Sequence, residues 1–161
     1  MNSFIVPFDL TADQVNALDT TPVDLGSFGP SVDSLVRVPA RAEVWRDAGT
    51  AYTITPVSGS IRSDTVSEFD NMFSEVKPIS PAMELVVRRK DSRGAYGEAI
   101  FRIPTGLLEN TTLTGLVVMP EPGQSYTGGD LSLTIEALTT ISGGTGSIHG
   151  LLYFDEYSLP L

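Results

Sequence analysis

Residues 82–103, "AMELVVRRKDSRGAYGEAIFRI", decide the fold of this chain. Apolar and polar side chains alternate at both ends of the stretch, as they do in half-buried β-strands. Between these ends lie Asp91 and Ser92, which favour a turn, and Gly94, which can adopt a positive φ. The stretch therefore predicts an antiparallel hairpin. The apolar residues that share a face are Met83, Leu85 and Val87 before the turn and Ala99, Phe101 and Ile103 after it.

The same period of two recurs on both sides of the hairpin. Residues 36–44 place Val36, Val38, Ala40, Ala42 and Val44 on one side, and Pro39 interrupts them, which indicates an edge strand or a bulge. With no alternation of strands and long helices, we expect an all-β fold: an antiparallel two-sheet β-sandwich of jelly-roll type. Further β-rich stretches are AYTITPV (51–57), LTGLVVM (113–119), LSLTIEAL (131–138) and SIHGLLYF (147–154).

Two short helices are expected beside these strands. Thr11 and Gln14 have the spacing of a capping box, so residues 10–18 predict one N-terminal helix. Residues 65–77 carry apolar side chains at helical spacing and end before prolines, which predicts a second helix inserted in the sandwich. We expect residues 1–30 to be an N-terminal arm with its helix, and residues 31–161 to be the β-sandwich domain.

The glycine-rich stretch "ISGGTGSIHGLLYF", residues 141–154, has two possible interpretations: a phosphate-binding loop or a turn between strands. A phosphate loop needs a lysine after its glycines and a helix behind it. The stretch contains no lysine, and an alternating strand follows it. We therefore expect the glycines to turn a hairpin.

Composition narrows the classes of partner. The 161 residues contain 20 acidic and 10 basic side chains, a formal charge of −10, and no cysteine. Such a surface repels phosphate backbones and anionic lipid, so we expect neither nucleic acid nor membrane as a partner. No basic leader and no apolar run of membrane-spanning length occurs, which favours a soluble protein made in a cytoplasm.

The sequence contains no pattern that positively supports a catalytic site. His149 is the only histidine, so it cannot supply a zinc site, and no G-x-S-x-G stretch accompanies it. A pair of carboxylates from distant strands stays open, because sequence spacing does not test it. We expect a non-enzymatic protein with no cofactor, no metal and no catalytic residue. Aromatic residues could form a sugar-stacking platform or simply belong to core and interface: Trp45, Tyr52, Tyr96, Tyr126, Tyr153 and Tyr157.

Several segments resemble small β-rich virion proteins of tailed bacteriophages. The segments are "LTADQVNALDTTPVDL" (10–25), "GTAY" (49–52), the turn at 143–146 and the aromatic Tyr153 in the last strand. The resemblance covers the two ends of the chain and not residues 58–110. It implies a structural protein of the virion, most simply a decoration or cement protein on the head exterior, or the base of a head fibre. It also implies synthesis in the host cytoplasm.

The implied partners are the major capsid protein or other virion proteins, and further copies of this chain, as a homo-oligomer such as a trimer. Two alternatives stay open: a neck or tail ring or adaptor protein of the particle, and a carbohydrate- or receptor-binding module. Apolar termini are expected to order against a neighbour. The expected interaction residues are Phe4, Ile5, Val6, Phe8, Trp45, Tyr153, Tyr157, Leu159 and Leu161.

Overall fold

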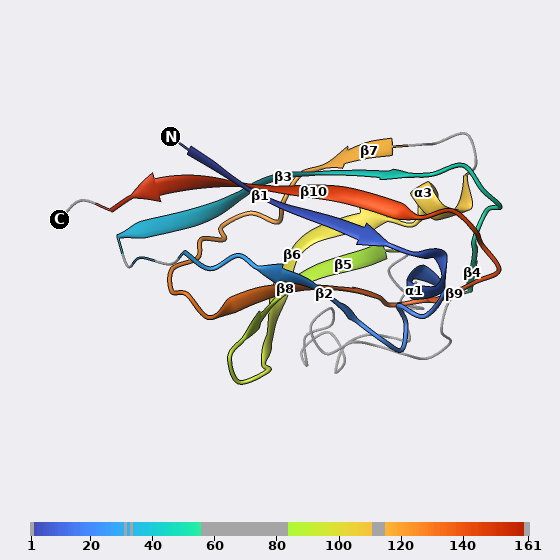
Figure 1. Ribbon diagram of the computed structural model, residues 1–161, viewed down its shortest axis with the longest axis horizontal. Coiled ribbons are helices and arrows are strands. Elements are labelled where there is room, and N and C mark those ends of the chain that lie inside the picture. Colours follow the sequence, from blue (N-terminus) through green and yellow to red (C-terminus); the bar gives the residue numbers. More distant parts are fainter. Residues whose placement is uncertain (1, 31, 33, 56–83, 111–114, 160–161) are drawn as a thin grey trace, which may run out of the picture.

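The computed structural model describes residues 2–30, 32, 34–55, 84–110 and 115–159. Two four-stranded sheets face each other, in the orders β1-β10-β3-β7 and β2-β8-β5-β6, and we call them the first and second sheet (Figure 1). The strands are β1 (Asn2–Leu10), β2 (Val23–Ser27), β3 (Leu35–Arg46), β4 (Thr53–Thr55), β5 (Glu84–Asp91), β6 (Tyr96–Pro104), β7 (Gly115–Val118), β8 (Leu131–Ala137), β9 (Thr140–Ser142) and β10 (Ile148–Ser158).

The pairing pattern is that of a jelly roll. β1 pairs with β10, β2 with β8, β3 with β7, and β5 with β6, all antiparallel, so the chain is a long hairpin rolled into two sheets. The short pair β4–β9 continues the same roll at the end of the molecule that lies opposite the two termini (Figure 1). The all-β sandwich predicted from the alternating stretches is confirmed.

The β5–β6 hairpin forms where residues 82–103 predict it. Asp91 accepts backbone N–H groups of Arg93 and Ala95 through its carboxylate, and Gly94 adopts a φ of 81°. Leu85, Val87, Phe101 and Ile103 are fully buried between the sheets, whereas Met83 lies outside the described residues.

Proline in β3 is accommodated by a bulge, and β3 is not an edge strand. The register of β10 against β3 jumps from Tyr153 opposite Arg41 to Phe154 opposite Pro39, so Ala40 is the extra residue. The bulge changes which side chains face inward. Pro39 is buried in the sandwich together with Ala42 and Val44. The expectation that Val36, Val38 and Ala40 lie on the same side as Ala42 and Val44 is therefore wrong.

The first 30 residues belong to the sandwich, which corrects their description as an arm. β1 pairs with β10 along its whole length, and β2 is an edge strand of the second sheet. Between them lies α1 (Ala12–Asn16), whose Thr11 and Gln14 form the predicted capping box. A further short helix, α3 (Gly106–Glu109), was not predicted. The helix predicted at 65–77 lies outside the described residues.

The glycine loop between β9 and β10 connects two sheets and does not form the predicted hairpin, because these strands pair with β4 and with β1 and β3. Gly143 and Gly146 adopt φ values of 72° and 94°. A Cβ on Gly144 would lie 2.1 Å from the ring of Tyr52, so only glycine fits against that ring. Tyr52 donates from its hydroxyl to the carbonyl of Gly146, at 2.6 Å. The loop is thus bound by the protein's own side chains.

Candidate interaction surface

Exposed apolar side chains concentrate on the outward side of the first sheet, which we call the outer face. Successive residues of a strand point to opposite sides of its sheet. In β1, Val6, Phe8 and Leu10 therefore enter the core, whereas Ile5 and Pro7 are exposed. Large apolar side chains that are more than a third exposed and lie on this face are Ile5 (44%), Trp45 (39%), Val117 (62%) and Tyr157 (46%).

At one end of the outer face, His149 lies between two carboxylates. Strand pairing places Asp9, His149 and Trp45 side by side on β1, β10 and β3. The imidazole Nδ1 lies 2.5 Å from Asp9 Oδ1, and Nε2 lies 3.0 Å from Asp47 Oδ2. The ring stacks on Trp45 with centroids 5.9 Å apart. Ionised carboxylates only accept hydrogen bonds, so the imidazolium, which donates from both nitrogens, satisfies both contacts.

This arrangement predicts a raised pKa for His149. The hydrogen bond to Asp47 and then the one to Asp9 raise the pKa above its ordinary value of 6.5, and partial burial opposes them. Because the pKa is raised on folding, the contribution to stability is complete below pH 6.5 and is lost as the pH rises through the folded-state pKa. NMR titration of the one histidine Cε1–H signal should show this pKa. Asp47→Asn and Asp9→Asn should each lower it.

Asp155→Asn is the matched control for this titration. Asp155 lies on the outer face opposite Ser3 and Val38, away from the imidazole, and its replacement removes the same charge. It should leave the His149 pKa close to the native value. An equal fall in all three variants would mean that the general field of the acidic surface raises the pKa, and not the two contacts.

A second polar group lies in the middle of the outer face. Tyr153 donates from its hydroxyl to a Glu43 carboxylate oxygen at 2.8 Å, and this bond raises the pKa of the Tyr153 phenol. The guanidinium of Arg41 lies 3.8 Å above the centre of the Tyr153 ring. Strand pairing places Tyr153 between Ile5 of β1 and Arg41 of β3 on this face.

The structure separates the expected interaction residues into two groups. Val6 and Phe8 are buried core residues, which corrects their expected role in contacting a partner, whereas Phe4 is partly buried and packs against the core. Their apolar character serves the sandwich, because β1 pairs with β10. Ile5, Trp45, Tyr153 and Tyr157 lie on the outer face, and Leu159 follows β10 and is 42% exposed. Leu161 lies outside the described residues.

The aromatic residues do not form one sugar-stacking platform. Tyr52 is buried beneath the glycine loop, and Trp45 and Tyr153 lie on the first sheet. Tyr96 and Tyr126 line a cleft beside the β5–β6 hairpin instead. Within the described residues, no group of three or more acidic or histidine side chains is arranged to hold a metal ion.

Several members of the surface were missed at the sequence level. Asp9 and Asp47 are 140 and 102 residues from His149, and nothing in their local sequence indicates that they meet. Val117 was assigned only to a β-rich stretch. Alternation within that stretch was the available signal, since Leu116 and Val118 pack on the core and Val117 must then face outward.

Comparison with known proteins gives no relative. No protein-family model, no curated protein and no solved structure matches the chain. Across the part of the chain that the structure describes, no helix has the length and apolar character needed to cross a membrane.

Proposed function

We propose that this protein is a non-enzymatic structural protein of a phage particle that decorates the outside of the head and stabilises it. The observation that carries the proposal is the outer face, a paired and rigid sheet surface on which exposed apolar side chains gather. Exposed apolar side chains that gather on one face of a protein, with polar residues around them, typify protein–protein contact sites. Jelly rolls serve viral capsids as well as lectins and other proteins, so the fold is compatible but not decisive.

The histidine supports a contact role over a catalytic one. Both ring nitrogens of His149 are engaged by carboxylates, which leaves neither free to deprotonate a nucleophile. Asp9 and Asp47 beside His149, and Asp155 farther along β10, also give the outer face negative charge. The complementary partner is a capsid surface that presents apolar side chains bordered by lysine or arginine. Self-association, for which a trimer is our expectation, would place several such faces around one symmetry axis.

Charge substitution on the outer face tests the proposal. Particles lacking this protein are incubated with purified Val117→Asp protein, and bound copies are counted by gel densitometry and by electron microscopy. Val117 is 62% exposed, so the variant should fold as the native protein does, while retention on heads should fall at least about tenfold. The matched control is Val32→Asp, since Val32 is 49% exposed and belongs to neither sheet.

The outcome also separates the alternatives. If the protein binds to necks or tails and leaves the heads bare, it is a ring or adaptor protein and not a head decoration protein. Equal retention of Val117→Asp and Val32→Asp would remove the outer face as the contact surface. Native protein that binds no part of the particle would overturn the virion proposal itself.

A further inference from the structure

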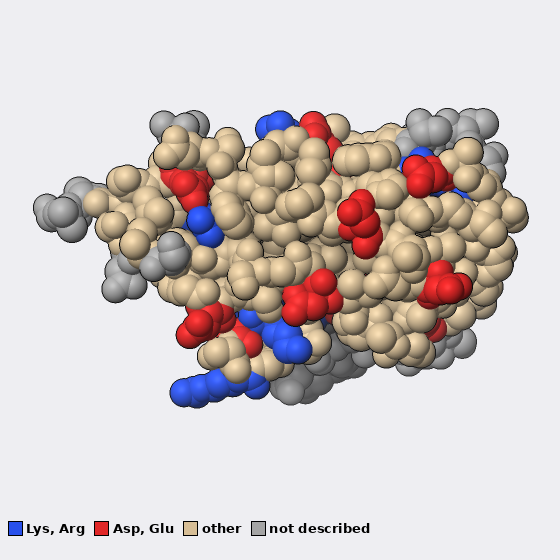
Figure 2. Space-filling model, viewed as in Figure 1, with Lys and Arg blue, Asp and Glu red and all other residues tan. Residues whose placement is uncertain are grey.

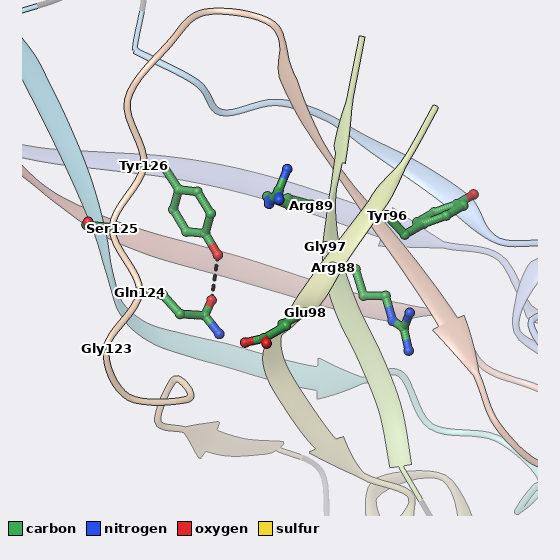
Figure 3. Close-up of a pocket in the computed structure, with 9 residues that line it drawn as sticks. All are labelled: Arg88, Arg89, Tyr96, Gly97, Glu98, Gly123, Gln124, Ser125 and Tyr126. Atoms are coloured by element: carbon green, nitrogen blue, oxygen red, sulfur yellow. Dashed lines mark hydrogen bonds between the residues drawn. The ribbon is translucent and has the colours of Figure 1, made fainter. Parts of the chain in front are cut away.

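A polar cleft lies beside the β5–β6 hairpin, away from the outer face. Its volume is about 570 Å³, within the range of small-molecule sites. Arg89 and Glu98 come from the hairpin, and Gln124 and Tyr126 come from the segment before β8 (Figure 3). The four side chains surround one space, whereas Arg88 and Tyr96 project to the other side of the hairpin in this view (Figure 3).

A bulge and a glycine place Arg89 in the cleft. The register between β5 and β6 shifts between Arg88 and Lys90, and bulges of this kind re-aim side chains. A Cβ on Gly97 would lie 2.5 Å from Arg89 Nε and 2.6 Å from its Cγ, so the arginine stem lies directly across the glycine. Among the described residues Arg89 forms no ion pair, and Glu98 forms none either. Both charges are available to a ligand.

The opposite wall is rigid. Tyr126 donates from its hydroxyl to Gln124 Oε1 at 2.5 Å, and Gln124 Nε2 donates to the Ala99 carbonyl at 2.6 Å. The Tyr126 ring also packs edge-on against Phe28, with centroids 5.0 Å apart. Burial raises the pKa of Tyr126 to about 12, so its hydroxyl keeps its proton at physiological pH. This wall is therefore held in place by its own contacts before a ligand binds.

The charge around the cleft differs from that of the whole protein. Although the chain carries a formal charge of −10, four of its ten basic residues lie in residues 88–93. Figure 2 shows the largest group of Lys and Arg side chains over this hairpin, at the lower left of the view. Local positive charge of this kind attracts anions that the remaining surface repels.

We infer that this cleft binds a carboxylate-bearing saccharide. A guanidinium binds a carboxylate through two parallel hydrogen bonds, and the guanidinium of Arg89 forms no ion pair within the part of the chain that the structure describes. Glu98 can accept hydrogen bonds from sugar hydroxyl groups. The same carboxylate repels a phosphate dianion, which would meet one cation and one anion at close range. A sugar unit that carries a single carboxylate surrounded by hydroxyl groups fits both charges. The inference does not depend on the proposed virion role.

The test is calorimetric titration of the full chain with a trimer of hexuronic acid, with a neutral hexose trimer as the comparison ligand. Arg89→Gln should weaken binding of the uronic trimer at least about tenfold, since a charged hydrogen-bonded pair contributes roughly 1.5–3 kcal/mol. Arg93→Gln removes the same charge from the exposed hairpin tip, outside the cleft, and should change the affinity by less than about threefold. The neutral trimer should bind at least about tenfold more weakly than the uronic trimer.

Each other result overturns the inference. If the uronic trimer gives no heat of binding, the cleft is not a saccharide site. If Arg89→Gln and Arg93→Gln weaken the affinity equally, the trimer is held only by the overall positive charge of the hairpin. Equal affinity for the two trimers would show that the carboxylate of the ligand does not contribute to binding. If Arg89→Gln unfolds, Arg89→Lys keeps the charge and loses the planar fork, and it should still weaken binding several-fold. Unchanged affinity in that variant would contradict the paired contact.

Discussion

Replacing Arg46 by methionine should lower the free energy of unfolding by about 3–5 kcal/mol. Arg46 is only 6% exposed and points inward at the end of β3. Its guanidinium donates to the carbonyls of Leu107 and Leu108, at 3.2 and 2.7 Å, and to those of Gly49 and Thr50, both at 3.2 Å. Methionine fills a similar volume but leaves these buried acceptors without donors. Urea unfolding followed by far-ultraviolet circular dichroism measures the loss.

Arg41→Met is the matched control for this variant. Arg41 lies on the same strand, but its side chain is 45% exposed and its ion pair with Glu43 is long, at 3.6 Å. The Arg41→Met replacement should lower the free energy of unfolding by at most about 1 kcal/mol. Equal destabilisation by the two replacements would show that Arg46 acts through strand propensity or net charge, and not by binding α3 and the loop after β3.

A Gly150→Ala variant should be destabilised by about 2–3 kcal/mol, a large cost for one methyl group. Gly150 faces the core on β10, directly opposite Phe8 on β1. A Cβ at this position would lie 2.2 Å from Phe8 Cε1 and 2.3 Å from Cζ. The ring is held by the core around it, so the clash must displace the strand or the ring. Thermal and urea unfolding should both show the loss.

Phe8→Leu tests the mechanism of that loss. Leucine lacks the ring atoms that the new methyl group would meet, so the double variant should be more stable than the sum of the single changes predicts, by about 1 kcal/mol or more. Gly129→Ala is the control glycine, because its Cβ would only contact Pro30 oxygen at an ordinary 3.6 Å. Strict additivity of Gly150→Ala and Phe8→Leu would contradict the close packing of these residues.

The two proposed surfaces lie on different sheets. The outer face belongs to the first sheet, whereas the cleft lies beside β6, an edge strand of the second. A copy attached to a capsid through the outer face would leave the cleft open to solvent. The protein could then bind the head and an external saccharide at the same time. Retention of Val117→Asp on heads tests the first contact, and titration of Arg89→Gln with the uronic trimer tests the second.

Local sequence was sufficient for features that depend on neighbouring residues. The capping box of α1 needs only Thr11 and Gln14, and the β5–β6 turn needs only Asp91 and Gly94. The β1 strand was mistaken for an arm because its pattern is equally consistent with binding a neighbour. Its pairing with β10 joins residues about 150 positions apart, which the local pattern does not specify.

The sequence by itself determined that the chain is β-rich and placed the hairpin at residues 82–103 and the strand periods of β8 and β10, because alternation and turn propensity act over a few residues. Only the tertiary structure decided which strands pair and which side of each becomes surface. The Ala40 bulge reverses the facing of β3, and β-sheet register brings Asp9 and Trp45 to His149. The Arg89 cleft likewise exists only after β6 lies beside the segment before β8. Such contacts arise from long-range packing, in which a shift of one residue would exchange core and surface.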